Sequence, residues 1–279
     1  MGNRKDHCKR STAQLLSLKA GNENEVARVL TDDEVRHYHD HGYVIPDFRL
    51  DDESLAHIRG SHARLLAKHP EFNDYCPAVL AFDTGFLNIA RIPAVLDMVE
   101  QLIGPDFALW NSSFFAKPAR VGTKTPWHQD GEYWPIRPLA TCSVWIAVDA
   151  ATPENGCLRV IPGSHRRREL GKHDFNGAAG LSLPLEIQAD EFDEDTARDI
   201  VLDVGQVSLH DIYLIHGSEP NRSDKPRRGM TLRYMPTTSR YCRELADSRR
   251  GGPLSMSERT LYLMRGEDRS GANDFRIRH

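Results

Sequence analysis

The second half of the chain contains a series of short runs rich in β-branched and aromatic residues, and this series constrains the fold most. Turn-forming stretches separate the runs, for example at residues 153–156 and 162–164. Many short strands punctuated by turns predict a sandwich or a jelly roll. The expected strands cover residues 107–117, 141–148, 158–161, 200–209 and 230–235.

The first third of the chain carries helix signals instead. Thr31 followed by Glu34 has the capping-box pattern, and helical spacing continues to Gly42, which favours a left-handed stop. Asp51 can cap a second helix. A third helix is predicted over residues 93–103, with Pro at its start and Gly directly after its end. We expect these helices to buttress one sheet.

The 279-residue chain shows no low-complexity linker and no internal repeat, so we expect one domain over residues 29–279. Residues 1–28 mix charges with a short apolar patch and are expected to form a flexible N-terminal extension. Residues 171–198 are too polar for a core and too long for a tight turn. Two interpretations stay equally open for this insertion: a mobile segment near the mouth of a site, or a solvated loop without a role.

The composition argues against several classes of protein. A net charge of −4 gives no basic excess of the kind found in nucleic-acid-binding proteins. Five scattered Cys without a Cys-x-x-Cys pair argue against a disulfide framework and a structural zinc site. No apolar run is long enough for a signal peptide or a membrane span. We therefore expect a soluble, cytoplasmic protein with no nucleic-acid or membrane partner, whose oligomeric state stays unknown.

His128 and Asp130 are the first candidates for chemistry. In an extended strand, side chains two residues apart point the same way. Imidazole and carboxylate are donors of a non-haem Fe(II) site when a second His completes a facial triad. His216, at the end of a later apolar run, is the candidate third ligand. The His-x-Asp pattern alone is a weak signal, because such pairs arise by chance.

Arg227 follows His216 by eleven residues. Its guanidinium is always charged and can hold a carboxylate at both oxygens, so the spacing indicates a co-substrate site. His210 and Asp211 superficially resemble another metal pair. Because adjacent residues of a strand point to opposite faces, we assign them a structural or supporting role.

Four blocks of sequence strengthen this interpretation by their order and spacing. They are His128-Gln129-Asp130 continuing into Tyr133-Trp134-Pro135-Ile136-Arg137-Pro138, then Val144-Trp145-Ile146-Ala147-Val148-Asp149, then Glu154-Asn155-Gly156-Cys157-Leu158-Arg159-Val160-Ile161-Pro162-Gly163-Ser164-His165, and last His216-Gly217-Ser218 with Arg227. Each block is modest alone, but the arrangement is highly specific. It resembles the phytanoyl-CoA dioxygenase family of Fe(II)/2-oxoglutarate oxygenases, from about Leu30 to near the C-terminus.

The resemblance implies a fold and an activity. The fold is a mainly β, double-stranded β-helix (a cupin-like jelly roll) with a helical buttress. The activity is that of a dioxygenase that uses Fe(II), 2-oxoglutarate and O2 and releases succinate and CO2. His128, Asp130 and His216 would bind Fe(II). Related halogenases have a small residue in place of the carboxylate, so the presence of Asp130 favours hydroxylation.

The resemblance also assigns the 2-oxoglutarate pocket. Arg227 would pair with the distal carboxylate, and Ser218 would hydrogen-bond the same end. Trp145 is expected to wall this pocket and Lys117 to face it. Arg228 competes with Arg227 for the carboxylate, but neighbours on a strand point to opposite faces, and the family spacing favours Arg227.

The substrate is expected just beyond the metal motif. Glu132 shares strand phase with the two ligands if the strand continues, and with Tyr133 and Trp134 it would suit an amine or quaternary ammonium group. Arg137 and Arg159 would hold a carboxylate, phosphate or phosphonate. The resulting hypothesis is a small polar metabolite, such as an amino-acid derivative, a betaine or an aminophosphonate. Structural salt bridges account for the same residues equally well.

Three other functions stay open. The first is hydroxylation of an acyl-CoA or lipid-like substrate. The second is a non-catalytic jelly-roll protein that binds a ligand; its sign would be loss of a metal ligand or of the Arg, and all of these residues are present. The third is a hydrolase with bound Zn²⁺, which the His and Asp donors allow but which leaves Arg227 without a task.

Overall fold

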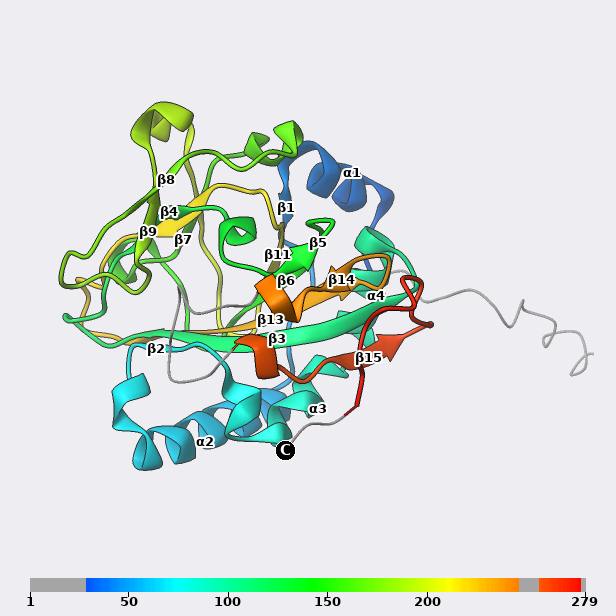
Figure 1. The fold of residues 1–279 in the computed structure, drawn as a ribbon. Helices are drawn as coiled ribbons and strands as arrows, with labels where there is room; N and C mark the ends of the chain where they lie inside the picture. The colour runs from blue at the N-terminus through cyan, green and yellow to red at the C-terminus, as the bar shows by residue number, and fades with distance from the viewer. Residues whose placement is uncertain (1–28, 246–255, 277–279) are drawn as a thin grey trace, which may run out of the picture.

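The computed structural model describes residues 29–245 and 256–276. The expected extension over residues 1–28 lies outside the described residues, so the division into an extension and one domain stays a prediction. Within the described part, antiparallel strands form two main sheets, and helices lie outside one of them (Figure 1). No helix of this part is long and apolar enough to cross a membrane.

The larger sheet has seven strands, in the order β1-β11-β6-β13-β3-β15 with β2 also paired to β3. The smaller sheet has the order β10-β7-β12-β4. The strands of the larger sheet are β1 (Tyr43–Val44), β2 (Tyr75–Cys76), β3 (Phe107–Lys117), β6 (Cys142–Ala147), β11 (Val207–Asp211), β13 (Arg227–Pro236) and β15 (Tyr262–Arg265). Those of the smaller sheet are β4 (Thr125–His128), β7 (Leu158–Val160), β10 (Arg198–Ile200) and β12 (His216–Ser218). Two further pairs join β5 (Ile136–Arg137) to β14 (Arg240–Tyr241) and β8 (His173–Phe175) to β9 (Leu185–Ile187).

Side chains of the larger sheet alternate between an apolar outer face and a polar inner face. On β6, Val144 and Ile146 belong to the main apolar core, whereas Ser143 and Trp145 point the other way. The same alternation on β13 places Met230, Leu232 and Tyr234 in the core. Because successive strand residues face opposite sides, one sheet can serve a core and a pocket at once.

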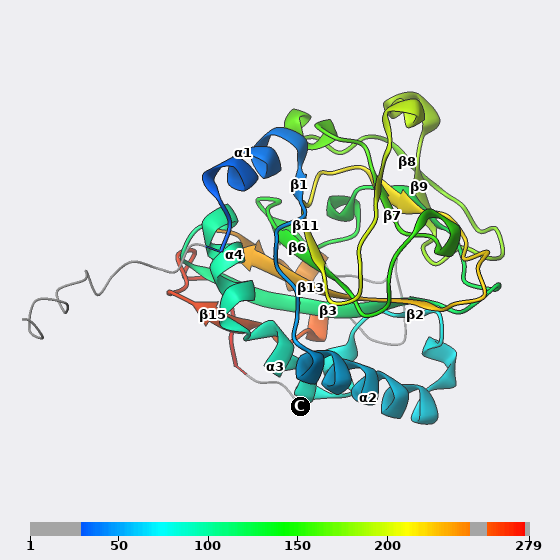
Figure 2. The ribbon, with the colours of Figure 1, turned by 180° about the vertical axis from the view of Figure 1, so that it is seen from behind.

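Helices cover the apolar face. In both views, α2 and α3 lie on the opposite side of β3 from the smaller sheet (Figures 1 and 2). The helices are α1 (Asp32–His41), α2 (Asp52–Lys68), α3 (Leu87–Ala90) and α4 (Pro93–Ile103). Leu55 and Ile58 of α2 and Met98 of α4 are buried in the same core as the sheet residues. The mainly β jelly roll with a helical buttress is therefore confirmed.

The predicted helix ends agree with the structure. Thr31 and Glu34 form both bonds of the capping box, and Gly42 ends α1 in the left-handed conformation. The carboxylate of Asp51 accepts a hydrogen bond from the backbone N–H of Ser54 at 2.6 Å. These local interactions replace the hydrogen bonds that the first turn of a helix cannot make internally.

Two stretches differ from the strand prediction or extend it. The strand expected over residues 200–209 is two strands in different sheets, because a turn closed by the N–H of Gln206 and the carbonyl of Asp203 lies between them. Residues 171–198 contain the β8–β9 pair. The Tyr133 hydroxyl donates to the carbonyl of Leu185 in β9 and accepts from its N–H, so this insertion is attached beside the metal motif.

Candidate active site

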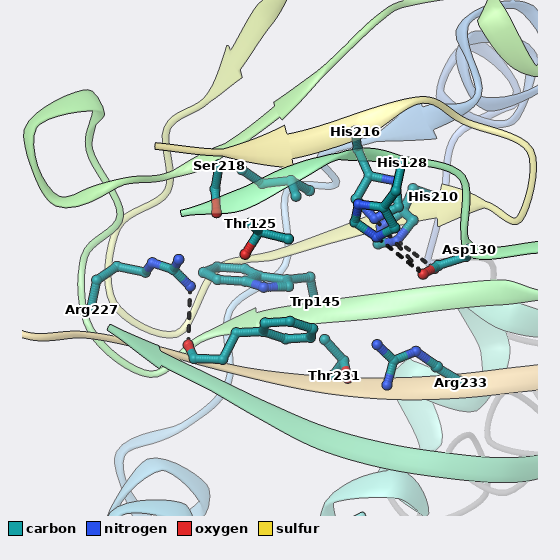
Figure 3. A pocket seen from close by; sticks show the side chains of 12 residues that line it. Thr125, His128, Asp130, Trp145, His210, His216, Ser218, Arg227, Thr231 and Arg233 are labelled. Atoms are coloured by element: carbon teal, nitrogen blue, oxygen red, sulfur yellow. Dashed lines mark hydrogen bonds and ion pairs between the residues drawn. The ribbon is translucent and has the colours of Figure 1, made fainter. Parts of the chain in front are cut away.

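A pocket lies between the inner face of the larger sheet and the smaller sheet (Figure 3). The larger sheet contributes Phe115, Trp145, His210, Arg227, Thr231 and Arg233. The smaller sheet contributes Thr125, His128, Leu158, His216 and Ser218, and Asp130 follows β4.

His128, Asp130 and His216 converge at one end of the pocket, as expected. The ligand atoms of the three side chains lie within 4.8 Å of one another. Antiparallel pairing sets His128 of β4 opposite His216 of β12, and their ring centroids are 4.2 Å apart. The Nε2 atoms lie 3.6 Å and 3.9 Å from Oδ1 of Asp130.

Both imidazoles are oriented by their other nitrogen. Nδ1 of His128 lies 2.8 Å from the carbonyl of Pro126, and Nδ1 of His216 lies 2.9 Å from that of Leu214. Because a carbonyl only accepts, each Nδ1 carries the proton and each Nε2 presents a lone pair to the centre. Burial, followed by the charge of His128, holds the pKa of His216 well below its usual range, which favours the neutral form that a metal needs. The donor set therefore fits a divalent metal ion.

Asp130 reaches this centre from a turn and not from the strand. β4 ends at His128, Gln129 stays extended, and Asp130–Glu132 form a 3₁₀ turn. The amide of Gln129 secures this turn by donating to the carbonyl of Tyr213 at 2.8 Å and accepting from the N–H of Gly171 at 2.7 Å. Glu132 would share the strand phase only if the strand continued, and this condition is not met, because the strand has ended.

The carboxyl of Asp130 lies among positive and polar partners. Burial opposes its ionisation, but His128, His210, His216 and Arg233 together hold its pKa well below the usual range. The hydroxyl of Ser143 donates to Oδ2 at 3.4 Å. The group is therefore a carboxylate at neutral pH, as a metal ligand must be.

Arg227 lies at the other end of the pocket and is 2% exposed. One terminal nitrogen donates to the carbonyl of Phe115 at 3.1 Å, and the guanidinium carbon lies 5.4 Å from the centre of the Trp145 ring. Among the described residues, Arg227 forms no ion pair and its Nε has no partner. Burial lowers its pKa to about 10, so the group stays charged at neutral pH. An anion bound there would complete the site.

Arg228 points away from the pocket, as strand alternation predicts. Its Nε and one terminal nitrogen each donate to the carboxylate of Asp149 at 2.7 Å. Gly229 makes room on the pocket face, because a Cβ there would lie 2.1 Å from the ring of Trp145. Trp145 and Ser218 line the pocket as expected.

Lys117 does not line the pocket, contrary to expectation. Its ammonium donates to the carbonyl of Glu219 at 2.7 Å and to that of Thr123. Burial, followed by the charge of Arg227, lowers its pKa to about 6. The side chain ties together the loops behind the pocket.

The five residues proposed for the substrate also lie outside the pocket lining. Trp134 is buried, with its ring centroid 4.8 Å from that of Trp110, and Tyr133 is held by β9. Arg137 is exposed and donates to the carbonyl of Ile136 at 2.7 Å. Arg159 pairs with Glu194 at 2.8 Å and with Asp199 at 3.2 Å. The salt-bridge interpretation therefore holds for Arg159, and Glu132 lies in the turn described above.

Sequence reasoning gave His210 a structural or supporting role, and it missed one charged residue of the pocket, Arg233. His210 lies on the pocket face of β11, with Nε2 3.6 Å from Oδ2 of Asp130, whereas its neighbour Asp211 pairs with Arg168. Arg233 follows Arg227 by six residues on β13. An even spacing on one strand puts two residues on the same face, and this signal was available in the sequence.

Comparison with known proteins agrees with this geometry. The family model of phytanoyl-CoA dioxygenase matches residues 25–229. Human peroxisomal phytanoyl-CoA dioxygenase is 25% identical over 240 residues, which cover 76% of this chain and 70% of the human protein. A probable alpha-ketoglutarate-dependent hypophosphite dioxygenase from Stutzerimonas stutzeri is 26% identical over 148 residues, covering 53% of this chain and 51% of that protein.

Solved structures show the same fold. The apo form of the non-heme monooxygenase ThoJ superposes with a TM-score of 0.67 and 28% identity, covering 86% of each chain. EvdO2 from Micromonospora carbonacea var. aurantiaca, complexed with 2-oxoglutarate, has a TM-score of 0.62 and 22% identity over 74% of this chain and 91% of its own. This chain therefore belongs to the phytanoyl-CoA dioxygenase family of Fe(II)/2-oxoglutarate-dependent oxygenases.

Proposed function

We propose that the protein hydroxylates a C–H bond of a small polar metabolite, with His128, Asp130 and His216 as the iron ligands. The observation that carries this proposal is the arrangement of one pocket: three convergent metal donors lie at one end, and at the other lies the guanidinium of Arg227, which has no ion-pair partner among the described residues. When bound, Fe(II) and 2-oxoglutarate supply the oxidising power, with O2 split between the hydroxylated product and succinate as CO2 leaves.

The protein's own groups hold and shield these reactants. Arg227 and Ser218 would bind the distal carboxylate of the 2-oxo acid, and Trp145 would wall its chain. The buried carbonyls of Pro126 and Leu214 keep the two imidazoles in the tautomer that ligates through Nε2. Burial of the triad limits access of water to the reacting centre.

A small polar substrate has two supports. The relative from Stutzerimonas stutzeri is described as acting on hypophosphite, a small anion. Beside the apolar Phe115 and Leu158, the lining beyond the metal ligands includes the polar groups of Arg233, Thr231 and His210, which a polar molecule could bind. A cytoplasmic location stays part of the proposal, supported by four described cysteines that are all buried and free.

Anaerobic absorption spectroscopy tests the assignment of the triad. Fe(II) and 2-oxoglutarate added to the protein should give the visible charge-transfer band of their chelate. His128→Ala and His216→Ala should each lose the band, because the two ligands that remain in each variant are too few to hold the iron. His57→Ala is the matched control and should keep it, since His57 lies on α2 and bonds the carbonyl of Gly85.

Two results would contradict the proposal. If both triad variants kept the band, the assigned ligands would be wrong. If the wild-type protein gave no band and released no succinate, the non-catalytic ligand-binding protein or the Zn²⁺ hydrolase would explain the pocket better.

A further inference from the structure

Arg233 is a second buried guanidinium in the pocket, and no role has yet been assigned to it. It is 5% exposed and lies at the metal end, whereas Arg227 lies at the opposite end of the same face of β13 (Figure 3). One terminal nitrogen donates to the hydroxyl of Ser113. Its Nε has no hydrogen-bond partner among the described residues. Most of its hydrogen-bonding capacity is therefore unused.

The surroundings of Arg233 fix its position without neutralising its charge. The guanidinium carbon lies 5.0 Å from the centre of the Trp134 ring and 5.9 Å from that of Phe115. These aromatic contacts hold the planar group in place. No carboxylate of the described residues lies within ion-pair distance of it. Asp130, whose pKa it helps to lower, is directed at the metal donors.

A second positive charge adds to the first. Arg259 is also buried, at 9% exposure, and its Nε has no partner within the described ranges. Burial lowers the pKa of Arg259, and the charge of Arg233 adds to the lowering. Arg259 does not line the pocket, but Arg233 does, and a buried charge without a counter-ion among the described residues is costly, so a negative group bound at Arg233 would be favoured.

We infer that Arg233 binds an anionic group of the substrate that is hydroxylated, a carboxylate, phosphate or phosphonate, and so positions the neighbouring C–H bond at the metal. This inference rests on the proposed function. It places the anion site at Arg233 in the pocket, in place of Arg137 and Arg159 on the outside. The planar fork of the guanidinium suits two-oxygen recognition of such a group.

The first test measures anion binding without turnover. The protein is loaded anaerobically with Fe(II) and 2-oxoglutarate, which occupies Arg227, and its thermal unfolding midpoint is measured with acetate, methylphosphonate or neutral acetamide at constant ionic strength. Both anions should raise the midpoint and acetamide should not. Arg233→Met should abolish the rise, and Arg159→Met and Arg137→Met, the matched controls, should retain it.

The second test measures turnover with pairs of compounds. Small carboxylates and phosphonates are compared with their uncharged amides or esters, and succinate is quantified. The compounds that stimulate succinate release should be anionic, and Arg233→Met should raise their KM by roughly tenfold or more. The KM of Arg233→Lys should lie between those of the wild-type protein and Arg233→Met. The KM for 2-oxoglutarate should change by less than about twofold, because Arg227 is intact.

The outcomes separate this inference from the function on which it rests. A wild-type protein that forms no chelate band overturns the proposed function itself. A band with an anion response that survives Arg233→Met, or that disappears in Arg159→Met or Arg137→Met, overturns only the role of Arg233. So does a rise in the KM for 2-oxoglutarate, which would make Arg233 part of the co-substrate site. The thermal unfolding midpoint of Arg233→Met without ligands shows whether the variant folds. It should match that of the wild-type protein, because the substitution removes a buried charge that has no counter-ion among the described residues.

Discussion

The outer and inner faces of the larger sheet come from the same strands but do different things. On β13, Met230, Leu232 and Tyr234 point outward into an apolar core covered by helices. Arg227 and Arg233 point inward, buried and charged. Burial of apolar surface stabilises the fold, whereas burial of unpaired charge opposes it. The outer face therefore stabilises the fold, and this stability offsets the cost of holding two buried cations on the inner face, where they can bind anions.

The largest expected effect is on the outer face. Leu232→Ala removes a fully buried side chain from the core, and we expect the free energy of unfolding to fall by about 2–5 kcal/mol. Urea unfolding measures the loss. The KM for 2-oxoglutarate in the protein that stays folded should not change. A large rise in that KM with little loss of stability would contradict the division between the two faces.

The next effect is on the inner face. Arg227→Met removes the charge that faces the distal carboxylate, so the KM for 2-oxoglutarate should rise by roughly 10- to 100-fold, while the ligand-free unfolding midpoint is retained or raised. Steady-state kinetics and thermal unfolding measure the two quantities. Arg228→Met is the matched control: it breaks the pair with Asp149 and should lower stability with little effect on this KM. The reverse pattern would assign the carboxylate to Arg228.

The pH dependence of the unfolding free energy distinguishes the protonation of His62 from the packing of its ring on the outer face. Burial, followed by the charge of Arg228, lowers the pKa of His62 to about 4, and its ring stacks on Phe114 at 4.3 Å. Between about pH 6.5 and 4 the unfolded chain therefore binds the extra proton, and stability falls as pH falls, by about 2 kcal/mol from pH 7 to 5.

His62→Phe should flatten this dependence in urea unfolding measured across that range. Leu65→Ala, on the same helix, is the comparison: it should lower stability at every pH and keep the slope. An unchanged slope in His62→Phe would show that another group causes it.

The smallest expected effect is at Gly229. A methyl group there would meet the ring of Trp145 at 2.1 Å, so Gly229→Ala should displace the wall of the pocket. We expect a loss of about 1 kcal/mol in stability and a severalfold rise in the KM for 2-oxoglutarate. Trp145→Phe combined with Gly229→Ala, which frees space, should recover part of both. No recovery would mean that the clash is not the cause.

The sequence was informative where the signal is local. Caps at Thr31 and Asp51 and the stop at Gly42 depend on neighbours a few residues away, and the structure shows all three. The motifs around His128 and His216 predicted that these residues would meet, which requires only that β4 and β12 pair.

Long-range contacts explain the rest. The strand ends before Asp130, where the amide of Gln129 bonds the carbonyl of Tyr213, 84 residues away. Arg159 follows Leu158, which lines the pocket, so it points to the other face of β7, where Glu194 of the insertion pairs with it. The position of Arg233 could be predicted without long-range contacts, since its even spacing from Arg227 places it on the pocket face of the same strand.

The most direct measurement of the central claim is a crystal structure of the protein with Fe(II) and 2-oxoglutarate, grown without oxygen. We predict iron bound by Nε2 of His128, Nε2 of His216 and the carboxylate of Asp130, with the distal carboxylate of the 2-oxo acid on Arg227. Arg233 should make no contact with the co-substrate. Iron bound elsewhere, or a distal carboxylate held by another residue, would contradict the account.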